Sequence, residues 1–235
     1  HKAGLHASAI KVDPDLYQHI DPADVGNDMR MLVSDMAGRA SIELKGRELG
    51  YDLSSDRDLV TRVTQRVKEL EAQGYTFEAA DASFELLLRE QVEGARPRFF
   101  EVDSWRVIVE SGQGWDAPSE ATVKVRAGGE RAVVTGEGNG PVNALDHALR
   151  TAIGALYPEI DKLELIDFKV RILDAAHGTD AVTRVLVEMA DGHSVWQTVG
   201  VGPNIIEASW EALTDSVTYG LLRQGAAPSN GEAGG

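Results

Sequence analysis

The spacing of apolar residues along the chain changes near residue 97. Between residues 55 and 94, apolar residues recur every three to four positions, the period of helices that bury one face. Beyond residue 97, short runs alternate apolar and polar residues, the period of strands that bury one face. The segment EGARPR at 93–98 has the glycine, proline and charges typical of a domain boundary. The pattern predicts an α+β protein with small helical subdomains first.

Three helices are expected before this boundary. A short one covers about residues 40–49 and ends at Gly50, and a longer one follows Ser55, its expected N-cap, and ends at Gly74. A third helix is expected after Thr76. The apolar faces of the two longer helices indicate ordinary core packing. They consist of Leu59, Val60, Val63, Val67 and Leu70 in the first, and Phe77, Ala80, Phe84, Leu87, Leu88 and Val92 in the second.

The alternating half of the chain contains an internal repeat. The order strand, strand, strand, helix is predicted twice, over about residues 97–158 and 159–225. The matching pairs are Trp105 and Phe168, Gly129 and Gly192, and Leu149 and Leu213, separated by 63, 63 and 64 positions. A steady offset with the same element order indicates a duplication. We expect the two β-β-β-α units to pack as a pseudo-two-fold pair, with sheets inside and helices outside.

These patterns divide the chain into four segments. Residues 1–50 are dense in turn signals, and residues 51–96 form a helical subdomain. The duplicated domain covers residues 97–225. The tail at 226–235 is small, polar and glycine-rich, so we expect it to be disordered.

Composition narrows the classes of partner. The chain has 235 residues, a formal net charge of −15 and no cysteine. A field of this sign repels phosphate backbones and anionic lipids, so we expect neither nucleic acid nor membrane as a partner. The absence of cysteine excludes disulfides and thiolate metal sites. No apolar run approaches the length of a membrane span, and no signal-peptide pattern opens the chain, so a cytoplasmic location is expected.

Two kinds of chemistry are visible in the residues alone. His1 and His6 are five apart, which is poor spacing for two ligands on one helix face, so no metal site is predicted. His6 is chemically suited to acid–base work. The turns GEGNGP and GVGPN each precede a helix. Such a glycine turn is either purely structural or a cradle for a small carboxylate ligand, and both interpretations stay open.

The first 42 residues, HKAGLHASAI through MAGRASI, resemble the segment that follows the catalytic barrel in the 2-isopropylmalate synthase family. The similarity is closest to the citramalate synthase-like branch. The duplication and WQTVGVGPNIIEASWEALTDSVTYGLL are similar to the C-terminal amino-acid-sensing domain of that family. The resemblance implies that residues 1–50 are a linker subdomain that crosses to a partner's active site, followed by the helical subdomain. It implies that residues 97–225 are a regulatory domain.

The resemblance implies a function for the enzyme of which this sequence would be a part. Family members condense acetyl-CoA with a 2-oxo acid on a divalent metal held in a (β/α)₈ barrel. That barrel is absent from this sequence, so we expect the chain alone to be inactive and to bind no cofactor. The implied role is the dimerisation and allosteric feedback module of a homodimeric citramalate synthase-like acyltransferase that uses pyruvate, in isoleucine biosynthesis. Ala7 and Ser8, where the isopropylmalate branch usually has Gln-Asp, favour that branch.

Site residues follow from the same resemblance. His6 and Tyr17 match residues that are contributed to the partner subunit's barrel, where imidazole and phenol can move protons or stabilise an oxyanion. Isoleucine or leucine is the implied effector, bound between the β-β-β-α units. The expected effector contacts are Asp174 for the ammonium group, backbone N–H groups near Asn204 for the carboxylate, and Trp196, Thr198, Ile205 and Ala208.

Three alternatives remain open on the sequence. The same parts of a 2-isopropylmalate synthase, for leucine biosynthesis, would carry similar segments. A free-standing amino-acid-binding module would need only the duplicated domain. A self-contained enzyme that uses His1 and His6 with acidic partners would release CoA from acetyl-CoA and pyruvate by itself.

Overall fold

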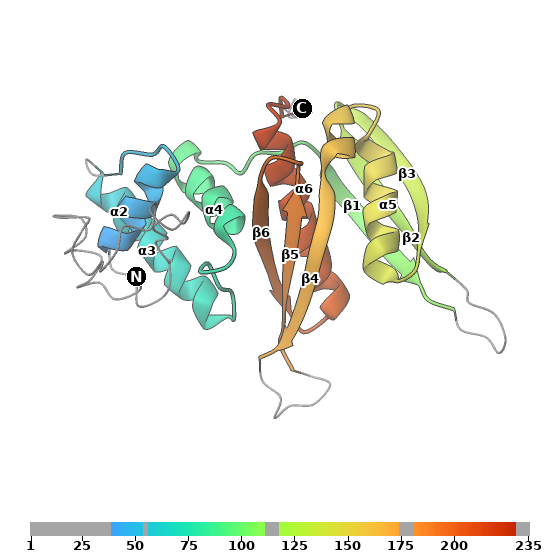
Figure 1. Ribbon diagram of the computed structural model, residues 1–235, viewed down its shortest axis with the longest axis horizontal. Helices are drawn as coiled ribbons and strands as arrows, with labels where there is room; N and C mark the ends of the chain where they lie inside the picture. Colours follow the sequence, from blue (N-terminus) through green and yellow to red (C-terminus); the bar gives the residue numbers. More distant parts are fainter. Residues whose placement is uncertain (1–38, 54–55, 111–117, 174–180, 229–235) are drawn as a thin grey trace. The chain divides into compact units, whose positions relative to one another are not determined.

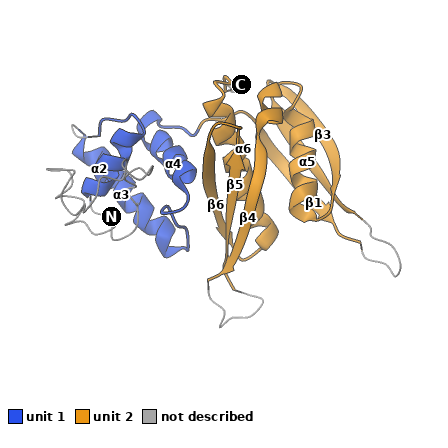
Figure 2. Cartoon of the chain, viewed as in Figure 1, with its two compact units in different colours: residues 1–96 blue, residues 97–235 orange. Residues whose placement is uncertain are grey.

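A computed structural model describes residues 39–53, 56–110, 118–173 and 181–228. The chain forms two compact units, residues 1–96 and 97–235 (Figure 2). The division falls inside the EGARPR segment. The predictions for His6, Tyr17 and Asp174 lie outside the described residues, as does the end of the tail from residue 229.

The first unit contains three described helices, α2 (Arg39–Glu48), α3 (Arg57–Ala72) and α4 (Asp81–Glu93). The predicted N-cap of α3 was wrong by one residue. Asp56 caps this helix, and its Oδ1 accepts a hydrogen bond from the N–H of Leu59 at 2.8 Å. A carboxylate at this position satisfies a free N–H group and also suits the positive end of the helix dipole.

The helices of the first unit bury the predicted apolar faces. The core consists of Ile42, Leu53, Leu59, Val60, Val63, Val67, Phe77, Phe84, Leu87 and Leu88. Phe77 and Phe84 pack edge to face with their ring centroids 6.2 Å apart. Val92 was predicted on the same face but is 41% exposed, because the last turn of α4 extends past Leu88, the last member of the core along the chain.

The second unit confirms the α+β class and the duplicated β-β-β-α order (Figure 1). Each repeat has a three-stranded antiparallel sheet, in the order β1-β2-β3 or β4-β5-β6. The first repeat contains β1 (Glu101–Ile108), β2 (Ser119–Ala127), β3 (Glu130–Gly138) and α5 (Pro141–Ile153). After the short 3₁₀ helix η2 (Pro158–Lys162), the second contains β4 (Glu164–Ile172), β5 (Thr183–Ala190), β6 (Val195–Gly202) and α6 (Ile205–Arg223).

The duplication extends to irregularities of the sheets. The pairing of β1 with β2 shifts register between Val102 and Ser104. The pairing of β4 with β5 shifts between Leu165 and Asp167, 63 positions later in both cases. Such bulges bend a strand and are built-in features of a fold, so their recurrence at the same offset supports a common origin of the repeats.

Each repeat packs its helix closely on its sheet through a glycine. A Cβ atom added at Gly136 in β3 would lie 2.5 Å from the backbone nitrogen of Ala148 in α5. One added at Gly200 in β6, 64 positions later, would overlap the carbonyl oxygen of Ala208 in α6. By contrast, the nearest atoms to a Cβ at Gly202 lie 3.9 Å away. The close approach of helix and strand therefore requires glycine at the first two positions.

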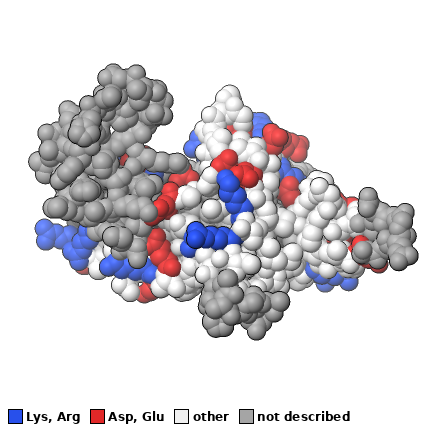
Figure 3. Space-filling view, turned by 60° about the horizontal axis from the view of Figure 1, so that its bottom comes forward, with Lys and Arg blue, Asp and Glu red and all other residues white. Residues whose placement is uncertain are grey.

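The helices, rather than the sheets, meet between the two repeats. α5 packs on β2 and β3, α6 packs on β5 and β6, and the two helices contact each other (Figure 1). The expectation of sheets inside and helices outside was therefore wrong. The outer face of β2 carries the exposed side chains of Lys124 and Arg126, and such charged residues stay in water unless they are paired. Acidic and basic side chains are interspersed on the surface drawn in Figure 3.

A carboxylate organises the turn between β5 and β6. Asp191 Oδ1 accepts hydrogen bonds from the N–H groups of His193 and Ser194 at 3.0 and 2.8 Å, and its Oδ2 accepts one from Gln224 at 2.9 Å. Burial raises the pKa of Asp191, but these bonds and the charge of Arg223 together outweigh it and hold the pKa below its usual value. This turn is therefore stabilised by the ionised carboxylate.

Candidate functional site

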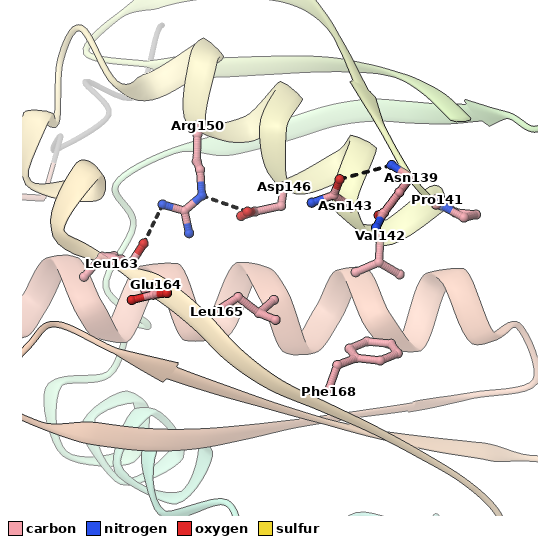
Figure 4. A pocket seen from close by; sticks show the side chains of 11 residues that line it. Asn139, Pro141, Val142, Asn143, Asp146, Arg150, Leu163, Glu164, Leu165 and Phe168 are labelled. Carbon is pink, nitrogen blue, oxygen red and sulfur yellow. Dashed lines mark hydrogen bonds and ion pairs between the residues drawn. The ribbon is translucent and has the colours of Figure 1, made fainter. Parts of the chain in front are cut away.

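A cavity of about 550 Å³ lies between α5 of the first repeat and β4 of the second. Figure 4 shows α5 above it, with Val142 directed from the helix toward Phe168 of β4 and the Asp146 carboxylate directed toward Arg150. The volume falls within the range of small-molecule sites in proteins. The cavity therefore joins residues from the two repeats at the contact between them.

The first turn of α5 forms one end of the cavity. Pro141 opens the helix and has no N–H group, and the N–H groups of Val142 and Asn143 have no acceptor within the helix. Gly140 is the N-cap, so no side chain caps these groups. Two free donors at the positive end of a helix dipole are suited to bind an anion.

The glycine at the N-cap is not required by backbone strain. Gly140 has φ −170°, which is extended backbone, and a Cβ there would meet nothing within 4 Å. Other residues, including the asparagine that often caps helices, could adopt this conformation. The consequence of glycine here is that the donors of Val142 and Asn143 stay open to the cavity.

A buried carboxylate forms the second polar feature. Asp146 is only 8% exposed, and its Oδ2 accepts a hydrogen bond from Nε of Arg150 at 2.8 Å. Arg150 is itself fixed, because its guanidinium donates to the carbonyl oxygens of Ile160 and Leu163 at 2.9 and 2.7 Å. Asp146 Oδ1 has no hydrogen-bond partner among the described residues. An unpaired buried oxygen is costly, so this atom is suited to accept a bond from a ligand.

The remaining wall of the cavity is mainly apolar. Val142, Leu165 and Phe168 line it beside the polar ends, and Glu164 adds a carboxylate at the rim. An anion site, a carboxylate acceptor and an apolar wall match the carboxylate, ammonium group and side chain of an apolar α-amino acid. The arrangement favours a zwitterionic ligand of that class.

Three of the predicted effector contacts lie between the sheet and the helix of the second repeat. Nε1 of Trp196 donates to the carbonyl oxygen and Oγ of Ser216, at 3.2 and 3.0 Å. Oγ1 of Thr198 donates to the carbonyl oxygen of Ala212 at 2.6 Å. Ala208 belongs to a buried apolar cluster of this repeat. Their role toward an effector stays a prediction.

Two other predicted contacts meet at the start of α6. Asn204 is the N-cap, and its Oδ1 accepts hydrogen bonds from the N–H groups of Ile206 and Glu207 at 2.8 and 3.4 Å. Ile205 is 44% exposed beside it. Asn204 and Ile205 thus lie at the start of α6, whereas Trp196 and Thr198 of β6 donate hydrogen bonds to residues of that helix. The effector role of Asn204 and Ile205 also stays a prediction.

Sequence reasoning missed Asp146, Arg150 and Phe168 as candidate site residues. A partial signal was present, because the GEGNGP turn was singled out as a possible carboxylate cradle. Asp146 and Arg150 are four residues apart on a helix, the spacing of an ordinary surface ion pair. Only the tertiary fold buries the Asp146 carboxylate, fixes Arg150 on the carbonyl oxygens of Ile160 and Leu163, and brings Phe168 to the same cavity.

The fold defines a duplicated β-β-β-α domain with a cavity between its repeats. Residues 78–221 match the family model described as LeuA allosteric (dimerisation) domain. The match covers more than half of the chain, and the chain belongs to this family. Residues 1–75 match a second model, described as homocitrate synthase post-HMGL domain-like.

Curated relatives are similar over nearly the whole chain. The (R)-citramalate synthase of Streptomyces coelicolor is 66% identical over 229 residues, which cover 97% of this chain and 43% of the relative. That of Geobacter sulfurreducens is 46% identical, covering 94% of this chain and 42% of the relative. The 2-isopropylmalate synthase of Ruminiclostridium cellulolyticum is 27% identical, with 96% and 41% covered. The chain thus spans less than half the length of these relatives.

Two further observations concern the described part of the chain. Within it, no three histidine, cysteine, aspartate or glutamate side chains gather in a way that could hold a metal ion. Within the described residues, no helix is both long and apolar enough to cross a membrane.

Proposed function

We propose that this chain is the dimerisation and allosteric feedback part of a citramalate synthase-like acyltransferase. The whole enzyme would condense acetyl-CoA with pyruvate and water to (R)-citramalate and CoA, in branched-chain amino-acid biosynthesis. Family membership and the 66% identity to the Streptomyces coelicolor relative support this assignment. A 2-isopropylmalate synthase is the second candidate, and the lower identity of 27% to such a relative makes it the weaker one.

The observation that carries the feedback role is the cavity between α5 and β4. Its free N–H groups at Val142 and Asn143 would bind the carboxylate of an amino acid. Asp146 Oδ1 would accept a hydrogen bond from the ammonium group. An aliphatic side chain would contact Leu165 and Phe168. Isoleucine or leucine is therefore the proposed effector class.

The catalytic contribution of the chain would be made in a homodimer. His6 and Tyr17 would reach the partner subunit's barrel, where they would move or hold a proton near the thioester. The divalent metal would belong to that barrel, which this sequence does not contain, and no cofactor is assigned to the chain itself. The chain alone is expected to release no CoA from acetyl-CoA and pyruvate.

Calorimetric titration of the chain with L-isoleucine and L-leucine tests the effector site. At least one should bind, and two truncated ligands should bind more weakly. The acid 3-methylpentanoate lacks the ammonium group, and 2-methylbutylamine lacks the carboxylate, so each loses one polar end. D-isoleucine is a control for chirality. No heat with either amino acid, on a folded dimer verified by light scattering, would contradict the proposed effector site.

A further inference from the structure

The duplication places an equivalent of each pocket residue in the other half of the domain. Gly140 and Asn204 are the N-caps of α5 and α6, and they lie 64 positions apart. The same offset relates Asp146 to Trp210. Phe168 of β4 corresponds to Trp105 of β1, 63 positions earlier. A second pocket related by the pseudo-two-fold would therefore lie between α6 and β1.

Two indole rings occupy that place. Trp105 of β1 and Trp210 of α6 are in contact, with ring centroids 6.3 Å apart and planes inclined by 49°. Trp210 is only 8% exposed. Tilted aromatic contacts of this kind are favourable beyond the apolar area they bury. Large side chains of the protein thus lie where the first pocket is open.

The N–H groups that would bind a ligand carboxylate in the second pocket are already hydrogen-bonded within the chain. At α5, the N–H groups of Val142 and Asn143 are free because Gly140 has no side chain. The equivalent N–H groups, those of Ile206 and Glu207, already donate to the side chain of Asn204. The Glu207 carboxylate in the first turn would in addition repel a ligand carboxylate.

The second repeat has no carboxylate where Asp146 would accept a bond from the ligand's ammonium group. Asp146, whose Oδ1 is free in the first pocket, corresponds to Trp210, which offers no carboxylate. Arg150, which orients Asp146, corresponds to Thr214, whose hydroxyl donates to the carbonyl oxygen of Trp210 at 2.9 Å. Both polar features of the first pocket are therefore absent or satisfied at the second position.

We propose that the Trp105–Trp210 pair and the Asn204 cap fill the second, pseudo-symmetric pocket from within, so that each chain binds one effector molecule, at α5. The inference rests on the proposed effector function and adds its stoichiometry and the residues that set it. Duplicated domains can bind a ligand in both halves, and here the repeats have specialised. The first repeat holds the ligand, and the second replaces the ligand with its own side chains.

The stoichiometry of the unmodified chain is the first test. Equilibrium dialysis with radiolabelled L-isoleucine, carried to saturation, should give one molecule bound per chain. Two molecules per chain would overturn this inference and leave the proposed effector function intact. No binding of isoleucine or of leucine would overturn both.

The second test exchanges the pocket residues of α5 with the equivalent residues of α6. In the variant Gly140→Asn/Asp146→Trp/Arg150→Thr, the first pocket acquires the cap, the indole and the threonine of the second, and saturable binding should disappear while the protein stays folded by circular dichroism. In Asn204→Gly/Glu207→Asn/Trp210→Asp/Thr214→Arg, which also removes the repelling carboxylate and supplies the arginine that orients the new aspartate, a folded protein should bind two molecules per chain. If the second variant fails to fold, the stoichiometry of the unmodified chain decides between one pocket and two. Retained binding in the first, or a single site in a folded second variant, contradicts the inference.

Discussion

Replacing Gly140 with asparagine should weaken effector binding and at the same time stabilise the protein. The extended backbone at Gly140 accepts a side chain, and a Cβ there meets nothing within 4 Å. The new side chain would accept hydrogen bonds from the N–H groups of Val142 and Asn143, as Asn204 does at the start of α6. The asparagine would then compete with the ligand carboxylate for these two donors.

The magnitudes of the two effects follow from the bonds involved. Hydrogen bonds to a charged group contribute about 1.5–3 kcal/mol to binding. Losing this contribution from the bonds between the ligand carboxylate and the N–H groups at the start of α5 should raise the Kd about 10- to 150-fold. Asparagine in place of glycine at an N-cap stabilises by a few tenths of a kcal/mol, which raises the Tm by about 1 °C in a chain of this size. A variant that was merely misfolded would lose both binding and stability.

Titration calorimetry with L-isoleucine and thermal melting measure the two quantities on the same preparation. Gly140→Ala is the matched control, because it adds a side chain without an acceptor. It should keep the Kd within about twofold and lower the Tm slightly, since alanine is a poor N-cap. If Gly140→Asn binds isoleucine as tightly as the unmodified chain, the carboxylate does not bind at the start of α5, and the reasoning is refuted.

Four further predictions concern other residues of the chain. Asp146→Asn should raise the Kd for isoleucine about tenfold or more by removing the charged acceptor, and leave that for 3-methylpentanoate nearly unchanged in calorimetry. Gly200→Ala should destabilise the protein by about 1–3 kcal/mol in chemical denaturation, whereas Gly202→Ala, where a Cβ has space, should cost much less. Asp191→Asn should lower the Tm at neutral pH and lose this effect as the pH falls below about 4, because a depressed pKa contributes stability only while the carboxylate is ionised. In the complete enzyme, His6→Ala should lower kcat about 100-fold, and an unchanged kcat would make His6 structural.

Much of the fold was predictable because it depends on local patterns. The apolar period in α3 identifies its buried face, since Leu59, Val63 and Val67 recur at helical spacing and all three are buried. The constant offset between Trp105 and Phe168 identifies the duplication without any three-dimensional information. Errors arose at the ends of elements. The cap of α3 is one residue later than predicted, and Val92 in the last turn of α4 is exposed although it follows the apolar pattern, because no other segment of the described residues covers it.

The amino-acid sequence by itself determined the element order, the repeat and the turn that opens α5. It could not determine that the helices of the two repeats meet, or which half of the duplication keeps a cavity. Asp146 and Trp210 stand at equivalent positions, and each lies near residues of the other repeat, distant in sequence: Phe168 lines the same cavity as Asp146, and Trp105 contacts Trp210. Burial of the Asp146 carboxylate and contact of Trp210 with Trp105 exist only once α5 meets β4 and α6 meets β1, so the tertiary structure decided where a ligand fits.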